Sequence, residues 1–151
     1  MARILLLEDD PLLSATLIDL LRNEGFEVLH ASDGEEALNI SYEQGCDLYL
    51  LDINVPLLNG IDFLKALREN GDKTPAFFIS AMKDIGTITK AFDSACDDYI
   101  KKPFDFEELL IRIKAHIAKK NPMMHYGNIQ YDLGSKRLFV EGKEVDLGQV
   151  D

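Results

Sequence analysis

Acidic residues follow two apolar runs of this sequence, and their types favour the binding of a divalent cation. The triplet Glu8-Asp9-Asp10 comes directly after three leucines, and Asp52 follows the largely apolar run Leu48–Leu51. Three carboxylates within about 4 Å of one another repel by several kcal/mol even at an effective dielectric of about 20, so such a cluster must be protonated, paired with lysine or filled by a cation. Carboxylate oxygens with room for water select Mg²⁺ or Mn²⁺.

A lysine and a hydroxyl extend this set toward phosphoryl chemistry. Ser80 ends another apolar run, and Lys102 is held by the Pro103-Phe104 turn that follows it. A cation and an ammonium would neutralise a phosphoryl group on a nucleophilic carboxylate such as Asp52, and a hydroxyl would donate a hydrogen bond to it. We therefore expect an aspartyl phosphate at Asp52. The simpler alternatives are that Asp52 is a helix cap or turn former and that Lys102 only pairs with the acids.

Five short aliphatic runs alternate with helical periodicity over residues 1 to about 120. This alternation predicts an α/β fold, a doubly wound parallel sheet of five strands with five helices, whose ligands bind outside the carboxyl ends of the strands. The predicted strands are Arg3–Leu7, Phe26–His30, Asp47–Leu51, Ala76–Ser80 and Asp97–Ile100. The predicted helices run from Asp10-Pro11 to Gly25, Asp33 to about Glu43, about Asn59 to Glu69, about Asp84 to Asp93, and onward from the capping box of Asp105 and Glu108.

The character of the sequence changes after residue 120, where Asn121-Pro122 interrupts the helical pattern. Short strand-like runs separated by glycine turns predict an antiparallel β meander. About 25 residues of meander cannot bury enough surface to form a domain alone, so we expect the start of a second domain whose remainder is missing. The predicted runs are Ile129–Asp132, Arg137–Glu141 and Glu144–Leu147.

Composition excludes several classes of protein. The 151 residues carry 16 basic and 27 acidic side chains, a net charge of −11, which argues against unassisted nucleic-acid binding. Cys46 and Cys96 do not match the spacing of a CxxC or Cys/His metal site, and they are interpreted as reduced thiols. Because no window approaches the roughly 18 apolar residues of a membrane helix and the amino terminus lacks a signal peptide, we expect a cytoplasmic protein with no membrane partner.

Four segments together resemble the receiver domain of two-component response regulators, over residues 1 to about 120. Each segment is modest alone, but all four in this order and spacing are highly specific. The resemblance implies a flavodoxin-like, CheY-like sheet with strand order 2-1-3-4-5. The segments that carry it are Ile4–Asp10, Asp47–Pro56 with Gly60, Ile79–Ala81, and Asp97–Phe104.

The resemblance implies a phosphoacceptor and a metal site. Asp52 would accept a phosphoryl group from the phosphohistidine of a sensor histidine kinase. Asp9, Asp52 and the backbone carbonyl of Asn54 would bind Mg²⁺ (or Mn²⁺), with Glu8 acting through water. A module of this kind catalyses its own phosphorylation and dephosphorylation, so the resemblance implies a signalling domain and not an enzyme.

A switch and a dimer face are implied in the same way. Ser80 and Tyr99 would form the switch pair, and Lys102 would contact the phosphoryl group through a Lys102-Pro103 bond that is cis in the family. In OmpR/PhoB-type members, phosphorylation drives homodimerisation through the fourth helix, fifth strand and fifth helix. The residues that match this pattern are Asp98 and Arg112 and, more loosely, Lys90 and Glu108; alternatively they are a solvated charged face.

The tail resembles the opening sheet of an OmpR-type winged-helix effector domain. On this basis residues 1–120 are the receiver, 121–127 a linker and 128–151 the first β-sheet of the effector, with the helix-turn-helix absent. Promoter DNA would then be a partner of the full-length transcription factor only.

Two alternatives and one departure from the family pattern stand beside this interpretation. The chain could be a receiver-like dimerisation module that is never phosphorylated. It could also be an aspartyl-phosphate phosphotransferase, but those enzymes commonly carry a second Asp two residues after the nucleophile, where Asn54 stands here. The usual Gly-Ala before the Asp-Asp-Tyr segment is Ala95-Cys96, which predicts a stiffer loop.

Overall fold

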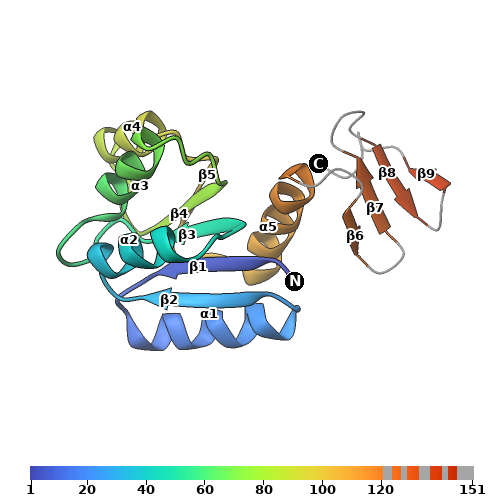
Figure 1. Cartoon of the computed structure of the whole chain (residues 1–151), viewed down its shortest axis with the longest axis horizontal. Helices are drawn as coiled ribbons and strands as arrows, with labels where there is room; N and C mark the ends of the chain where they lie inside the picture. Colours follow the sequence, from blue (N-terminus) through green and yellow to red (C-terminus); the bar gives the residue numbers. More distant parts are fainter. Residues whose placement is uncertain (121–123, 127–128, 133–136, 141–142, 146–151) are drawn as a thin grey trace. The chain divides into compact units, whose positions relative to one another are not determined.

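The computed structural model describes residues 1–120, 124–126, 129–132, 137–140 and 143–145, with side chains described through residue 118. The chain divides into two compact units, residues 1–105 and 106–151. The first unit, described in full, alternates five strands with four helices (Figure 1).

Elements of the first unit follow the predicted alternation closely. The strands are β1 (Arg3–Leu7), β2 (Glu27–Ala31), β3 (Leu48–Leu51), β4 (Ala76–Ser80) and β5 (Asp98–Lys101). The helices are α1 (Pro11–Asn23), α2 (Gly34–Glu43), α3 (Gly60–Glu69) and α4 (Ile85–Asp93). The first and fourth strands have the predicted bounds, whereas the second and fifth begin and end one residue later than predicted.

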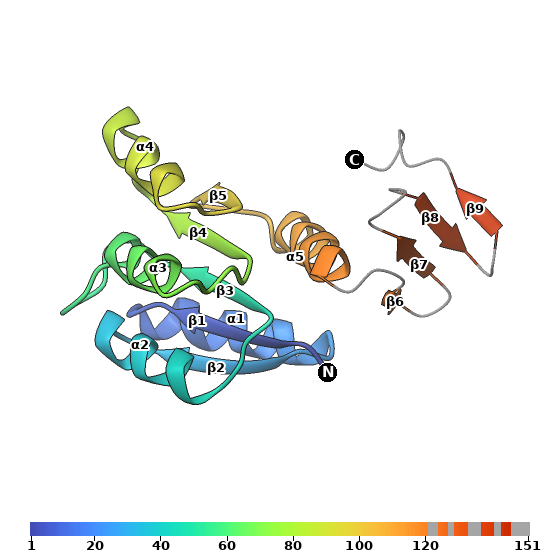
Figure 2. The same ribbon diagram turned by 45° about the horizontal axis from the view of Figure 1, so that its top comes forward.

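The five strands form one parallel sheet in the order β2-β1-β3-β4-β5, which confirms the predicted topology (Figure 2). All residues of β3 and β4 are buried, as is typical of central strands covered on both faces. The edge strand β5 is partly exposed along its length. Asp52, which follows β3, and Ser80, which ends β4, are therefore held by strands that are buried along their whole length.

Short polar side chains start the four helices of the first unit. Each cap residue has an extended backbone, and its side-chain oxygen accepts a hydrogen bond from an amide of the first turn, which satisfies a donor that the helix leaves unpaired. The caps are Asp10, Asp33, Asn59 and Asp84, all at predicted helix starts.

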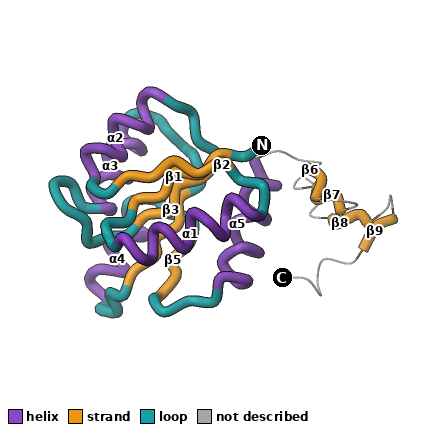
Figure 3. Tube along the Cα trace, turned by 90° about the horizontal axis from the view of Figure 1, so that it is seen from below, coloured by secondary structure: helices purple, strands orange, loops and turns teal. Residues whose placement is uncertain are grey.

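Helices cover the two faces of the sheet separately. Helix α1 lies behind the sheet and α2 and α3 lie in front of it (Figure 2), and the view from below shows the same separation (Figure 3). Side chains alternate between the faces along each strand. One face of β1, β3 and β4 therefore joins a core cluster with α2, α3 and Ala91 of α4, through residues that include Leu5, Leu7, Tyr49, Leu51, Phe63, Leu64 and Phe78.

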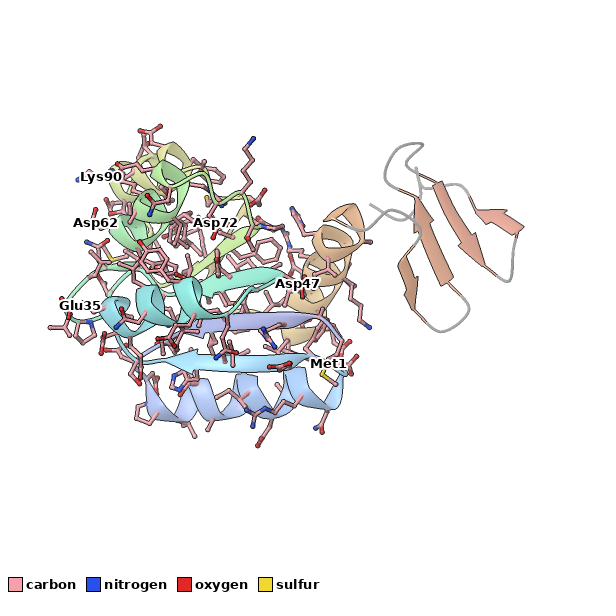
Figure 4. All side chains as sticks on the ribbon, in the orientation of Figure 1. Met1, Glu35, Asp47, Asp62, Asp72 and Lys90 are labelled. Atoms are coloured by element: carbon pink, nitrogen blue, oxygen red, sulfur yellow. The ribbon has the colours of Figure 1, made fainter. Side chains whose placement is uncertain are left out.

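The two edges of the sheet differ in chemistry. The carboxyl edge, where β1, β3, β4 and β5 end, lies on the side of Glu35, and the opposite amino edge lies on the side of Asp47 (Figure 4). At the amino edge, the hydroxyl of buried Tyr49 donates to Asp72 Oδ2 at 2.6 Å. Burial raises the pKa of the Tyr49 phenol, and the hydrogen bond to Asp72 raises it further.

The second unit contains α5 (Phe106–Lys120) and a separate antiparallel sheet in the order β6-β7-β8-β9. Its strands are β6 (Met124–Tyr126), β7 (Ile129–Asp132), β8 (Arg137–Val140) and β9 (Lys143–Val145). The last three correspond to the predicted meander. Strand β6 was not predicted, because its three residues lie in the segment assigned to a linker and only pairing with β7 defines them as a strand. Residues 121–123, 127–128, 133–136, 141–142 and 146–151 of the predicted linker and effector segment lie outside the described residues.

The helices and the two cysteines bear on the predicted class of protein. Among the described residues, no helix combines the length and apolarity needed to cross a membrane. Cys46 is buried and Cys96 half-buried, and neither is joined to another cysteine in a disulfide bond. Burial raises the pKa of the Cys96 thiol to about 11, so it is protonated at neutral pH.

Ala95 occupies a backbone conformation that favours glycine. Its φ is 65°, and its amide donates to Phe92 O at the end of α4, the left-handed position that commonly ends a helix. A non-glycine residue pays about 1–2 kcal/mol there because its Cβ approaches the following carbonyl. The loop in which the sequence predicts added stiffness therefore also contains a strained residue, Ala95.

Ala95→Gly is expected to raise the free energy of unfolding by about 0.5–1 kcal/mol, since relief of this strain exceeds the added entropy of the unfolded chain. Urea denaturation at neutral pH measures the change. The same substitution at Ala66, inside α3, should lower stability by about 1 kcal/mol. A loss of stability at both positions would contradict the strain.

Tyr49→Phe is expected to lower the free energy of unfolding by about 1–2 kcal/mol at neutral pH, because it removes a hydrogen bond to a carboxylate. Burial opposes ionisation of Asp72, but hydrogen bonds from Tyr49 and Thr74 outweigh it and lower the pKa of the carboxyl. A lowered pKa stabilises the fold above the unfolded value of about 3.9, and that stabilisation is lost as the pH falls through the folded value. The difference between wild type and variant should therefore narrow below about pH 4, whereas the exposed Tyr42→Phe should show a small, pH-independent change.

Candidate functional site

Three carboxylates meet at the carboxyl edge, as the sequence predicts. Glu8 and Asp9 follow β1 and Asp52 follows β3; these strands are neighbours, with Leu7 opposite Leu51. The Asp52 amide donates to Leu7 O at 2.8 Å, so β1 and β3 remain paired up to the acidic residues. One ligand oxygen from each of Glu8, Asp9 and Asp52 lies within 4.8 Å of the other two.

Lys102 supplies the predicted positive charge. Its Nζ lies 2.8 Å from Glu8 Oε1 and 3.3 Å from Asp52 Oδ2. The Lys102 amide donates to Ser80 O at 2.9 Å, which holds the end of β5 beside the end of β4, and the Lys102–Pro103 peptide bond is cis, as the resemblance implies. One ammonium thus contacts carboxylates from two different strands.

Burial and charge act in opposite directions on Glu8. Its side chain is only 3% exposed, so burial raises the pKa of its carboxyl; the Lys102 hydrogen bond opposes this, and the nearby Asp52 charge raises the pKa further. For Lys102, burial opposes the charged form, but the hydrogen bonds and charges of Glu8 and Asp52 together outweigh it and raise the pKa of the ammonium. The lysine therefore remains charged at neutral pH and partly neutralises the cluster.

Two glycines allow the loop after β3 to pack closely around Asp52. A Cβ on Gly60 would lie 2.2 Å from Asp52 O, and one on Gly34 would lie 1.8 Å from Leu58 O, both too close for any other residue without movement of the backbone. In the same loop Leu57 has a φ of 70°. Gly60 belongs to the segments quoted above, whereas Gly34 carries no sequence signal beyond its place after the Asp33 cap.

The proposed switch pair meets at the backbone of Met82, two residues beyond Ser80. Ser80 Oγ accepts from the Met82 amide at 3.1 Å, and the Tyr99 hydroxyl donates to Met82 O at 2.8 Å. The Tyr99 ring also contacts Phe78 and Phe92, with ring centroids 6.4 and 6.5 Å apart. Sequence could not reveal this role because it uses main-chain atoms, which every residue type has.

The other predicted residues have less defined surroundings. The Asn54 side-chain amide approaches Met82 Sδ at 3.4 Å, while its backbone carbonyl stays a predicted metal ligand. Arg112 Nη2 lies 2.8 Å from Glu108 Oε1, so these two predicted dimer-face residues pair within one helix. Lys90 is exposed on α4 and Asp98 partly exposed on β5. Their predicted role in pairing two chains stays a prediction.

The donor set at the carboxyl edge fits a small, hard divalent cation. It consists of three carboxylates, whose combined negative charge is larger than the positive charge of one lysine. Asp9 is exposed, which leaves access for water. Mg²⁺ is usually bound in proteins by one or two carboxylates while it keeps several waters. Glu8, Asp9 and Asp52 are therefore the described residues best placed to hold such an ion.

Comparison with known proteins agrees with this geometry. A family model described as the response regulator receiver domain matches residues 4–114. The cell cycle transcriptional regulator CtrA of Caulobacter vibrioides is 36% identical over 149 residues, which cover 96% of this chain and 64% of the relative. This chain thus spans less than two thirds of that relative's length.

Solved structures show the same fold. A Francisella response regulator receiver domain matches with a TM-score of 0.76 and 29% identity, over 80% of this chain and 100% of the other. The receiver domain of a sensor histidine kinase from Pseudomonas aeruginosa PAO1 matches with a TM-score of 0.72 and 29% identity, over 78% and 98% of the two chains. That structure has a magnesium ion coordinated in its active site cleft.

Substitutions at Asp9 and Lys102 are expected to change Mg²⁺ affinity in opposite directions. Asp9→Asn removes a ligand charge and should weaken binding roughly tenfold or more. Lys102→Gln removes a competing positive charge that contacts two of the carboxylates and should strengthen binding several-fold. Calorimetric titration with Mg²⁺ measures both, with the exposed Asp62→Asn as the charge-matched control. Equal affinities in wild type and Asp9→Asn would contradict this metal site.

Proposed function

This chain belongs to the family of response regulator receiver domains, and on that basis we propose that Asp52 accepts a phosphoryl group from the phosphohistidine of a sensor histidine kinase. The observation that supports this assignment most strongly is the contact of one ammonium, Lys102 Nζ, with both Glu8 and Asp52 beside Asp9. Asp52 directly follows a buried central strand, and its side chain is 10% exposed at the carboxyl edge.

The transfer requires little from the protein beyond position and charge. An Asp52 carboxylate oxygen forms a bond to phosphorus while the phosphorus–nitrogen bond of the donor breaks, and the electron pair of that bond returns to the imidazole. The ionised carboxylate has no proton to lose. Lys102 neutralises phosphoryl oxygens, and bound Mg²⁺ supplies further positive charge there.

The roles of the remaining acids follow from their existing hydrogen bonds. Glu8 Oε1 accepts from Lys102 and Oε2 accepts from the Asp10 amide at 3.2 Å. Both oxygens are therefore engaged, which supports a role for Glu8 through water. Asp9, Asp52 and the Asn54 carbonyl are then the direct ligands that we propose for Mg²⁺.

Phosphorylation would be transmitted by Ser80 and Tyr99. A phosphoryl group adds nearly two negative charges and three acceptor oxygens, and Ser80 is the hydroxyl that would donate to it. Because Ser80 and Tyr99 both contact the Met82 backbone, movement of Ser80 would reach Tyr99 through one shared residue.

The longer protein is proposed to be a transcriptional regulator. One relative, CtrA of Caulobacter vibrioides, is a transcriptional regulator that extends beyond the length matched here. We propose residues 1–120 as the receiver, 121–127 as the linker and 128–151 as the start of a winged-helix effector domain. Homodimerisation on phosphorylation would use Asp98, Arg112, Lys90 and Glu108, and the full-length dimer would bind promoter DNA.

Incubation with acetyl phosphate and Mg²⁺ is expected to add one phosphoryl group, detected by intact mass. Asp52→Asn should abolish the adduct because the amide is a far weaker nucleophile than the carboxylate. Asp62→Asn, which removes an exposed carboxylate of α3, should leave it unchanged.

Other outcomes would favour the alternatives. Multiple turnover of the phosphate donor without a stable adduct would indicate a phosphotransferase. No adduct at any Mg²⁺ concentration would indicate a receiver-like module that acts without phosphorylation.

A further inference from the structure

Arg68, near the end of α3, binds the backbone of two loops at the amino edge of the sheet. Its Nη1 donates to Asp72 O at 2.9 Å and to Thr74 O at 2.7 Å, while Nε and Nη2 donate to Ala95 O at 3.1 and 2.9 Å. Nη2 also lies 3.5 Å from Asp97 Oδ2. One guanidinium thus joins the loop before β4 to the turn before β5.

The same turn determines where β5 begins. The Asp97 amide donates to Ala76 O at 2.7 Å, and the Ala76 amide donates to Asp97 Oδ2 at 2.8 Å. Asp97 therefore pairs the start of β5 with the start of β4. Two residues later, this register places Tyr99 opposite Phe78.

Helix α4 is buried mainly near its carboxyl end, just before the turn that Arg68 contacts. Of this helix, which the structure describes in full, only Ala91 is buried, and Ser94 just beyond it is buried too. Ile85, at the other end, is 77% exposed. Phe92, near the carboxyl end, is 51% exposed, but its ring lies against that of Tyr99. Few buried apolar contacts mean a low local stability, so the amino end of α4 is the part most free to move.

We propose that Arg68 is a positioning residue for the switch. By holding the turn between α4 and β5, it makes a change at Ser80 move the amino end of α4 and Tyr99 instead of displacing the whole segment. This inference rests on the proposed function. According to it, Arg68, at the opposite edge of the sheet, controls how strongly Asp52 and Tyr99 are coupled.

The coupling must act in both directions. If occupation of Asp52 favours one arrangement of Tyr99, then that arrangement favours binding at Asp52 equally, and a Tyr99 segment free to take other arrangements binds less tightly. A merely structural arginine would lower the stability of the fold and leave that binding unchanged. The planar guanidinium is suited to this position because one side chain donates to three carbonyls, which a lysine ammonium cannot match in fixed geometry.

The test uses Arg68→Gln and beryllofluoride, a phosphoryl mimic, with Mg²⁺. Fluorine NMR of bound beryllofluoride gives its affinity, and 3-fluorotyrosine labelling reports on Tyr99, assigned by Tyr99→Phe. We expect affinity to fall roughly two- to thirtyfold. The Tyr99 resonance, which should shift to a single new position in the wild type, should remain broad or split in the variant.

Arg3→Gln is the matched control. Arg3 also lies at the amino edge, where its Nη1 donates to Gly45 O at 3.0 Å and its Nε pairs with Glu27 at 2.9 Å, but it contacts neither α4 nor β5 through any interaction described here. Its loss should lower stability without changing beryllofluoride affinity or the Tyr99 response. Arg68→Lys should give a smaller loss of affinity than Arg68→Gln, and it carries the test alone if the glutamine variant does not fold.

The outcomes separate the two proposals. Equal affinity and equal Tyr99 response in wild type and the Arg68 variants would overturn the role of Arg68 and leave the proposed function standing. Equal loss in Arg3→Gln would also overturn it, since the effect would then follow stability alone. Failure of the wild type to bind beryllofluoride would overturn the proposed function itself.

Discussion

Repulsion among the carboxylates of Glu8, Asp9 and Asp52 is the constraint on which the carboxyl edge depends. Their oxygens lie within 4.8 Å of one another, and two of the three side chains are buried, where water screens them least. One ammonium contacts two of them. A site with this residual negative charge responds strongly to an added cation, and with a cation bound it can receive a further anionic group.

The sheet sets this charge cluster rigidly in place. Strands β1 and β3 are paired up to the residues that carry the acids, and the loop after β3 returns so closely that Gly60 admits no side chain. Functional groups held by central strands keep their geometry better than groups on free loops. The energy of hydrophobic burial in the core thus maintains an electrostatically unfavourable arrangement at its edge.

The part of the sheet near β5 and α4 has fewer buried residues than the part that carries the acids, so its local stability is lower. Strand β5 is a short edge strand, and α4 exposes large apolar side chains. The Met82 backbone connects Ser80 and Tyr99 at the carboxyl edge, while Arg68 binds the end of the same segment at the amino edge. A rigid half that holds the charge and a looser half that can rearrange are therefore combined in one sheet.

Strand order, helix starts and the identity of the acidic and basic residues could be predicted from the sequence, because they depend on local periodicity, on short capping side chains and on the resemblance to a known family. Strand β6 could not be predicted, since three residues acquire strand geometry only by pairing with β7. Nor could the roles of Met82, Gly34 and Arg68, which act through backbone atoms or through contacts between loops distant in sequence. The sequence by itself determined which chemical groups this protein carries and roughly where each strand delivers them. Only the tertiary structure decided which backbone atoms connect them, because main-chain donors and acceptors are the same in every residue and gain a specific partner only when the chain has folded.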